Sequence, residues 1–160
     1  TVYNVYKSII AMRGGIPEPK KENVMLENIR IEDLVESDFL AVKQTDSMRI
    51  LLRAVMDSRR NIFPVVNDDG VLAGIVTLDN VRPFIMDSQL YDVALVYDVM
   101  AAPGPCLDAN DSLADATKLF EKWHAWNLPV LKNGKYIGFV SKSGVFDRYR
   151  NMLRNKQDLF

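Results

Sequence analysis

The chain has 160 residues, of which 48% are hydrophobic and 26% are charged, a composition typical of a soluble globular protein. Its formal net charge of −1 argues against nucleic-acid binding, because proteins that neutralise phosphates normally carry a basic excess. The single cysteine, Cys106, excludes an internal disulfide and is typical of a reducing cytosol. The sequence contains no signal peptide and no apolar run of about 18 residues, and we expect the chain to be part of a longer protein.

An internal repeat organises the sequence. Residues 31–64 align with residues 96–129 at an offset of 65 residues, and the offset falls to 64 after a shortened turn. A turn is where a repeat can lose a residue at little cost. The paired positions include Asp33 and Asp98, Asp46 and Asp111, Ser47 and Ser112, Pro64 and Pro129, Gly74 and Gly138, and Thr77 and Ser141.

The first copy contains, in chain order, an extended piece, a helix, two strands and a second helix. The extended piece covers residues 40–42, and Asp46 is expected to cap a helix over 48–59, whose apolar residues recur at helical spacing. Two apolar runs, 62–66 and 71–77, predict strands joined by a turn at Gly70. Thr77 is then expected to cap a helix that runs through Val81 to Met86.

The second copy repeats this order. An extended piece at 106–107 precedes a helix that Asp111 is expected to start, and strands over 128–131 and 136–141 flank the tight turn Asn133-Gly134. A helix over 143–153 closes the copy. The sequence therefore predicts an α+β fold built from two β-α-β-β-α repeats. Each repeat alone would expose one apolar sheet face, so we expect the two to pack face to face.

The strand motifs of both copies resemble those of the CBS domain. Phe63-Pro64-Val65-Val66 and Gly74-Ile75-Val76-Thr77 carry the likeness in the first copy, and Asn127-Leu128-Pro129-Val130 and Gly138-Phe139-Val140-Ser141 carry it in the second. The resemblance implies a tandem CBS pair (a Bateman module), with CBS domains over 29–93 and 94–153 related by a pseudo-twofold axis. It implies a regulatory role and no enzymatic activity.

Two segments narrow the resemblance to CLC-type chloride channels and transporters. Residues 4–14 are similar to the segment that leaves the last membrane helix in that family, with Asn4 and Lys7 in place of its serine and threonine. Residues 138–143, followed by Phe146 and then Tyr149-Arg150, are similar to the second CBS domain of bacterial members. The likeness implies that residues 1–28 link the module to a membrane domain of the same polypeptide and that 154–160 form a C-terminal tail. The module would then lie at the cytoplasmic face of the cell (inner) membrane, pair into a homodimer, and bias chloride gating or proton/chloride exchange.

The CBS resemblance also implies two candidate pockets for an adenine nucleotide: ATP, ADP, AMP or adenosine. In each, a hydroxyl at a strand-to-helix junction, Thr77 or Ser141, lies near backbone N–H groups that favour phosphate. The strand ends at 62–64 and 127–129 would meet adenine, and Trp126 would offer a stacking face. The candidate ligand-binding residues are Val42, Ile62, Phe63, Pro64, Thr77, Asp79, Asn80, Leu107, Trp126, Asn127, Leu128, Pro129, Ser141 and Gly144.

Both pockets depart from the family pattern, which places an aspartate three residues after the hydroxyl to accept two bonds from the ribose. Asn80 offers one neutral acceptor there and Gly144 offers none, a loss of roughly tenfold to a hundredfold in affinity. The first pocket is therefore expected to bind better than the second. Asp79 would need a shifted helix register to take the place of the aspartate.

Simpler explanations apply to the same residues. Thr77 and Ser141 are also explained as helix caps, Trp123 and Trp126 as core or interface anchors, and Cys106 as a small buried apolar residue. No paired carboxylates, nucleophile–base set or metal cluster recurs, so we expect no catalysis. Two alternatives to the channel module stay open: a ligand-free dimerisation scaffold, and an adenylate-sensing pair that belongs to a different host.

Overall fold

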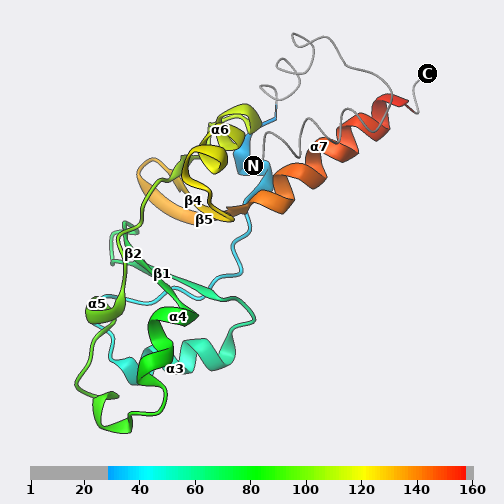
Figure 1. Ribbon diagram of the computed structural model, residues 1–160. Coiled ribbons are helices and arrows are strands. Elements are labelled where there is room, and N and C mark those ends of the chain that lie inside the picture. Colours follow the sequence, from blue (N-terminus) through cyan, green and yellow to red (C-terminus); the bar gives the residue numbers. More distant parts are fainter. Residues whose placement is uncertain (1–28, 158–160) are drawn as a thin grey trace. The chain divides into compact units, whose positions relative to one another are not determined.

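The computed structural model describes residues 29–157, and its elements follow the predicted repeat (Figure 1). The first copy contains α3 (Met48–Asp57), β1 (Ile62–Val66), β2 (Leu72–Thr77) and α4 (Leu78–Val81). The second copy contains β3 (Leu107–Asp108), α6 (Leu113–Trp123), β4 (Asn127–Lys132), β5 (Lys135–Ser141) and α7 (Lys142–Gln157). Short helices connect them: η1 (Ile31–Leu34), η2 (Arg82–Phe84), η3 (Ser88–Leu90) and α5 (Val96–Val99). The α+β prediction is confirmed, and the bounds of all five strands lie within one residue of those expected. The extended piece expected at 40–42 forms only an isolated bridge at Val42.

Serine side chains begin both amphipathic helices. At the start of α3, Ser47 Oγ accepts a hydrogen bond from the backbone N–H of Ile50 at 3.3 Å. At the start of α6, Ser112 Oγ accepts from the backbone N–H of Asp115 at 3.2 Å, and the Asp115 carboxylate accepts in return from the N–H of Ser112 at 2.9 Å. These bonds satisfy N–H groups that have no partner inside the helix.

The prediction that Asp46 and Asp111 cap these helices is wrong by one residue. Each carboxylate instead accepts a 2.8 Å hydrogen bond from a backbone N–H three residues earlier, that of Lys43 for Asp46 and that of Asp108 for Asp111. A short acidic side chain can serve a turn as well as a helix end, and here it closes the turn before the helix.

The predicted helix through Val81 to Met86 is also corrected. The α-helical turn α4 starts directly after β2 and ends at Val81, and the chain continues in the tighter helix η2. Pro83 lies in the first turn of η2. Since proline has no N–H, it cannot donate the bond that would extend α4.

The two sheets repeat one pattern of strand pairing. β1 and β2 are antiparallel, with Ile62 opposite Thr77, while the second sheet has the order β3-β4-β5. Val42 forms a parallel bridge with Val65, and Leu107 pairs in parallel with Val130. Both members of the second pair stand 65 residues after those of the first, so the duplication read from the sequence is present in the hydrogen bonding.

The described chain divides into two compact units whose limits differ from the sequence repeats. We call residues 37–104 and 133–138 the first-repeat unit, and residues 29–36, 105–132 and 139–157 the second-repeat unit. The segment before each copy belongs to the unit of the other copy, since Arg30 bridges Ser112 and Leu95 bridges Ser47. The boundaries 29–93 and 94–153 therefore stay a prediction about the sequence repeat, and the compact units cut the chain elsewhere.

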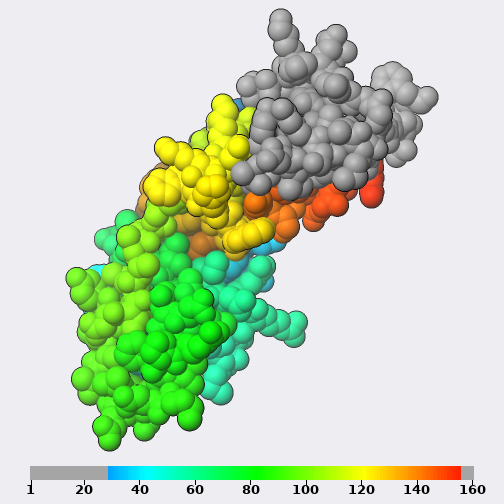
Figure 2. Space-filling model, viewed as in Figure 1, coloured from blue at the N-terminus to red at the C-terminus, as the bar shows by residue number. Residues whose placement is uncertain are grey.

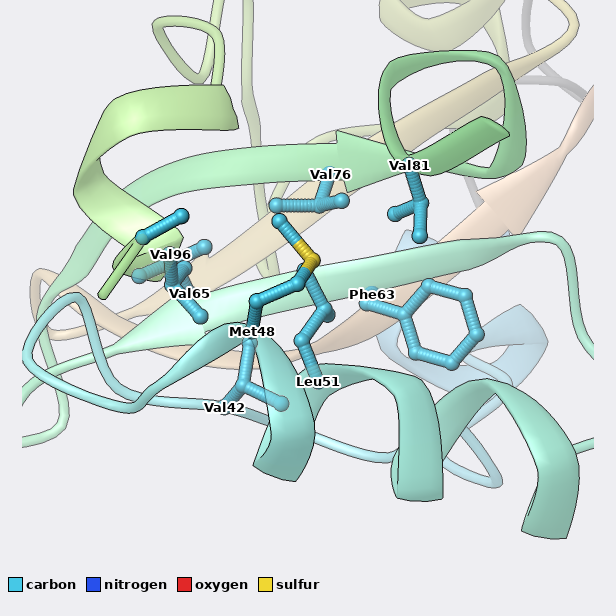
Figure 3. Close-up of a cluster of buried hydrophobic side chains, with 9 residues drawn as sticks. Val42, Met48, Leu51, Phe63, Val65, Val76, Val81 and Val96 are labelled. Atoms are coloured by element: carbon cyan, nitrogen blue, oxygen red, sulfur yellow. The ribbon is translucent and has the colours of Figure 1, made fainter. Parts of the chain in front are cut away.

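A cluster of buried apolar side chains forms the core of the first-repeat unit (Figure 3). The apolar face of α3 points Met48 and Leu51 towards the two strands, and both side chains are buried. The rest of the cluster comes from the bridge, strand and short-helix positions Val42, Phe63, Val65, Val76, Val81, Ala94 and Val96. In the second-repeat unit the buried apolar residues include Leu113, Ala116 and Phe120 of α6, Phe139 and Val140 of β5, and Val145 and Tyr149 of α7.

Candidate ligand-binding site

Thr77 lies at the junction of β2 and α4, where its polar groups are bound by Asn80. The backbone N–H and the hydroxyl of Thr77 both donate to Asn80 Oδ1, each at 3.0 Å. The side chain that closes this helix start is therefore Asn80, and the Thr77 hydroxyl acts as a donor. Asp79 is exposed and lies 3.3 Å from Arg82, so its carboxylate is directed to a cation further along the chain.

The strand residues predicted for the first pocket can offer only backbone groups. Val42 and Phe63 are buried in the core (Figure 3), and Pro64 is buried in β1. The carbonyl of Pro64 accepts from the N–H of Val42, and the N–H of Val66 donates to the carbonyl of Val42, each at 2.9 Å. Because strand residues alternate in direction, the backbone of Ile62 faces the same edge of β1.

A cavity of about 530 Å³ lies in the second-repeat unit, within the range typical of small-ligand sites. We call it the Trp126 cavity. It is lined by residues from the start of β4, the β5–α7 junction and one face of α7: Trp126, Asn127, Ser141, Lys142, Ser143, Phe146 and Arg150. The structure thus brings together Trp126, Asn127 and Ser141, three of the residues that the sequence assigned to the second pocket.

The cavity has an aromatic wall with a cation on it. Trp126 is 73% exposed, which excludes a core role, and Trp123 at the end of α6 is 54% exposed. The end of α6 and the turn after it, yellow in Figure 2, lie on the visible surface of the molecule. Lys142 Nζ lies 4.6 Å from the centroid of the Trp126 ring, and the Lys142 N–H donates to the Trp126 carbonyl at 2.8 Å.

A second cation, Arg150, lines the cavity from α7. Its guanidinium lies 2.7 Å from a carboxylate oxygen of Asp147, one helical turn earlier. Both side chains of this pair are about half exposed, so the pair is weak and its opening costs little. Arg150 is therefore able to turn towards an anion in the cavity.

Ser141 fixes the start of α7 next to Gly144. The Ser141 hydroxyl oxygen accepts a hydrogen bond from the N–H of Gly144 at 2.9 Å, so its role as a helix cap is confirmed. A Cβ added at position 144 would lie 2.9 Å from that same oxygen. Gly144 thus brings no side-chain acceptor to the site, and any larger residue at this position would require the Ser141 hydroxyl to move.

The remaining candidates contribute less. The side chains of Leu128 and Pro129 are buried in β4. Leu107 is buried as well, and it lines a separate cavity of about 330 Å³ beside Cys106 and α6. Burial raises the pKa of the half-buried Cys106 thiol, which lowers its thiolate fraction and its reactivity.

Sequence reasoning missed four residues that line the Trp126 cavity: Lys142, Ser143, Phe146 and Arg150. Three of them recur every fourth residue on α7, at 142, 146 and 150, which is the spacing of one helix face. That periodicity could have identified them from the sequence, because it places two cations on either side of Phe146 on one face of the helix.

A family model for the CBS domain matches residues 31–87 and 96–151. The chain belongs to the CBS domain family. Both matches coincide with the two repeats, which supports a tandem CBS pair. CBS-pair proteins are generally regulatory, and such pairs commonly dimerise.

The chain also resembles individual proteins in sequence or in fold. A homoserine O-acetyltransferase of Methanocorpusculum labreanum is 27% identical over 112 residues, and the aligned region covers 70% of this chain but 22% of that enzyme. A CBS-pair protein of Arabidopsis thaliana superimposes with a TM-score of 0.65 at 20% identity, over 78% of this chain and 96% of that one. The cytosolic domain of the Mg²⁺ channel MgtE, solved in complex with ATP, superimposes with a TM-score of 0.63 at 20% identity, over 79% of this chain and 51% of that one.

Residues 29–157 contain neither a candidate metal site nor a candidate membrane-spanning helix. Among them, no group of three or more His, Cys, Asp or Glu side chains is placed to hold a metal ion. No helix in the same range is both long enough and apolar enough to span a membrane. The stretch 4–14, which carries part of the CLC likeness, lies outside the described residues.

Proposed function

We propose that this CBS pair is a regulatory module that binds an adenine nucleotide in the Trp126 cavity and thereby biases the activity of its host. The observation that carries the proposal is the composition of the cavity. An indole face, the start of β4 and two cations line one space of about 530 Å³. A planar base and a phosphate chain are the two parts of a ligand that such a lining accommodates.

The start of β4 provides the groups that would recognise the base. The N–H of Ala109 donates to the carbonyl of Leu131 at 2.8 Å, so the backbone of Leu131 faces β3. Alternation along the strand places Asn127, four residues earlier, on the same edge. Asn127 also lines the cavity, where its backbone groups would bond the edge of an adenine ring.

The host we propose is a CLC-type chloride channel or proton/chloride exchanger, with the pair at the cytoplasmic face of the cell membrane. Support comes from the likeness of residues 4–14 and 138–143 to that family. The ATP-bound cytosolic domain of the magnesium channel offers a precedent for this fold in a channel protein. In such a host a homodimer of CBS pairs would bias gating through a coupling free energy of about 1–3 kcal/mol.

Calorimetric titration of the 160-residue chain with ATP, ADP, AMP and adenosine tests the binding proposal. Saturable heat at sub-millimolar ligand is expected, and Trp126→Ala should abolish it. Trp123→Ala is the matched control, since Trp123 is also exposed but does not line the cavity. A flat titration with all four ligands contradicts nucleotide binding. The host is tested by the gene upstream of Thr1, which should encode a polytopic membrane region.

A ligand-free dimerisation scaffold is the second candidate function. The observation in its favour is that Gly144 offers no acceptor and that the oxygen of Asn80 is occupied by Thr77. A concentration-dependent dimer in sedimentation, together with a flat titration, would establish the scaffold. An adenylate-sensing pair in a different host is the third, and it predicts binding without an upstream membrane region.

A further inference from the structure

We propose that the Trp126 cavity selects its ligand by the phosphate chain, through Lys142 and Arg150, and does not read the ribose diol. This inference rests on the proposed nucleotide binding and specifies the class of ligand: a nucleoside di- or triphosphate, whether ribo- or deoxyribo-. A nucleoside without phosphates should bind poorly in the same cavity.

The residues that line the cavity include cations but no carboxylate. Of the seven described residues that line it, two are cations and none is acidic. Asp147, which does not line the cavity, forms a partly exposed ion pair with Arg150. A ribose diol is best bound by an acceptor with two oxygens, whereas phosphate oxygens are bound by ammonium and guanidinium groups. The chemistry of the lining therefore favours the phosphate end of a nucleotide.

The position where an acceptor would be needed carries no side chain. Gly144 has no side chain, and its N–H already donates to the Ser141 hydroxyl oxygen at 2.9 Å. A side chain at position 144 would begin 2.9 Å from that oxygen and would displace it. The start of α7 thus offers a ligand no side-chain acceptor at position 144.

The two cations are spaced for an extended ligand. Lys142, Phe146 and Arg150 follow one another at intervals of four residues along α7. At a rise of 1.5 Å per residue, Lys142 and Arg150 are about 12 Å apart along the helix. A base stacked near Trp126 with a chain of two or three phosphates can approach both side chains, which line the same cavity.

Lys142 also controls access to the aromatic wall. Its ammonium lies 4.6 Å from the centroid of the Trp126 ring, and both residues line the cavity. A base that stacks on this face must displace the ammonium, which loses a cation–π contact. A phosphate chain offers Lys142 a new charged partner, whereas a bare nucleoside offers none. Nucleosides should therefore bind more weakly than nucleotides for two reasons. They offer no phosphate to attract Lys142, and they displace Lys142 from the Trp126 ring without giving it a new partner.

The first experiment compares ATP, 2′-deoxyATP, ADP, AMP and adenosine by calorimetry on the full chain at one ionic strength. ATP is expected to bind at least about tenfold more tightly than adenosine, because each charged hydrogen bond contributes about that factor. ATP and 2′-deoxyATP should agree within about twofold, because no lining group reads the diol. Equal affinity for ATP and adenosine, or a loss of about tenfold or more on removing the 2′-hydroxyl, would overturn the inference.

The second experiment uses charge-removing variants of α7. Lys142→Met should weaken the binding of ATP by about tenfold. The same variant should bind adenosine as tightly as the wild type or more tightly, since the indole face is uncovered. Arg150→Met should weaken ATP and leave adenosine unchanged. Arg148→Met is the matched control, because Arg148 is an exposed cation of α7 that does not line the cavity. Loss of ATP binding in the control as large as in the two variants would show a general charge effect and overturn the inference.

The two proposals fail in different ways. If none of the five ligands binds, the proposed nucleotide binding fails and this inference falls with it. If all five bind with similar affinity and Trp126→Ala abolishes that binding, the proposed function stands and selection by phosphate is refuted.

Discussion

Asn80 receives two hydrogen bonds from Thr77 on one amide oxygen, from the backbone N–H and from the hydroxyl, each at 3.0 Å. An amide nitrogen cannot accept from a backbone N–H, so this arrangement fixes which way the Asn80 amide points. Its oxygen is committed to the start of α4, and its NH₂ group is the part left for any ligand. The asparagine that replaces the family's aspartate is therefore a structural residue in the first-repeat unit.

The bonds between Asn80 and Thr77 should contribute measurably to stability. We expect Asn80→Ala to lower the free energy of unfolding by about 1 kcal/mol, the usual cost of losing a polar side chain at a helix start. Asn80→Asp should retain both bonds, since a carboxylate accepts from the same two donors. Urea denaturation checks both variants. Asp79→Ala is the control, and a loss in that variant equal to the loss in Asn80→Ala would contradict the assignment.

The sequence was sufficient for the fold because the duplication doubles every signal. Ser47 and Ser112 occupy equivalent positions and make equivalent caps, and each strand motif recurs with its turn. What it could not assign was which of two adjacent polar residues caps a helix. Asp46 and Ser47 are both suitable N-cap residues. The backbone conformation of the preceding turn decides that the Asp46 carboxylate accepts from the N–H of Lys43 instead.

The candidate site was predicted only in part, for a geometric reason. Trp126, Asn127 and Ser141 stand at strand ends, where the repeat shows them directly. Lys142 and Arg150 line the same cavity because one face of α7 points towards it. Which face does so depends on the residue at which that helix begins. It begins at Lys142, one residue earlier than the sequence predicted. The preference for the first pocket over the second stays a prediction.

The ion pair between Asp38 and Arg60 should make stability depend on pH in the acid range. Arg60 donates to both carboxylate oxygens, at 3.0 and 2.6 Å, and this hydrogen bonding lowers the pKa of Asp38 in the folded chain. The unfolded value is about 3.9, so the pair stabilises the fold fully above that pH and is lost as the pH falls through the lower folded value.

Asp38→Asn should therefore flatten the acid limb of the stability curve. The wild-type chain is expected to lose more unfolding free energy than the variant between about pH 5 and pH 2. The reason is that the Asp38 carboxylate, whose pKa is lowered in the folded chain, is present in the wild type and absent from the variant. Denaturant unfolding at several pH values measures the difference. Asp69→Asn removes an exposed carboxylate in the turn after β1 and serves as the control. Parallel curves for wild type and Asp38→Asn would refute the role of the pair.

Two apolar residues on α3 separate core packing from helix propensity. Leu51 is fully buried in the cluster of Figure 3, whereas Met56 is 84% exposed. Leu51→Ala should cost about 2–5 kcal/mol of unfolding free energy through lost burial and the cavity that remains. Met56→Ala should change it by less than about 0.5 kcal/mol, because little surface is buried there. Similar losses in the two variants would contradict the position of this core.

Glycine-to-alanine changes at positions 74 and 144 should differ in their effect on stability. In β2, a Cβ at Gly74 would lie 2.7 Å from the carbonyl oxygen of Ala101, which accepts from the N–H of Ile75 at 2.9 Å. A backbone carbonyl held in this bridge cannot yield cheaply, so Gly74→Ala should destabilise the fold by about 1–3 kcal/mol.

In α7, a Cβ at Gly144 would meet only the Ser141 hydroxyl, at 2.9 Å, and that group can rotate away. Gly144→Ala should therefore be neutral or gain up to about 1 kcal/mol, because alanine loses less backbone entropy in a helix. Urea unfolding of both variants, with the slope against denaturant compared as well, decides the matter. A destabilisation as large at Gly144 as at Gly74 would mean that the Ser141 cap is worth more than the helix propensity gained, and the start of α7 would then be a rigid feature of the fold.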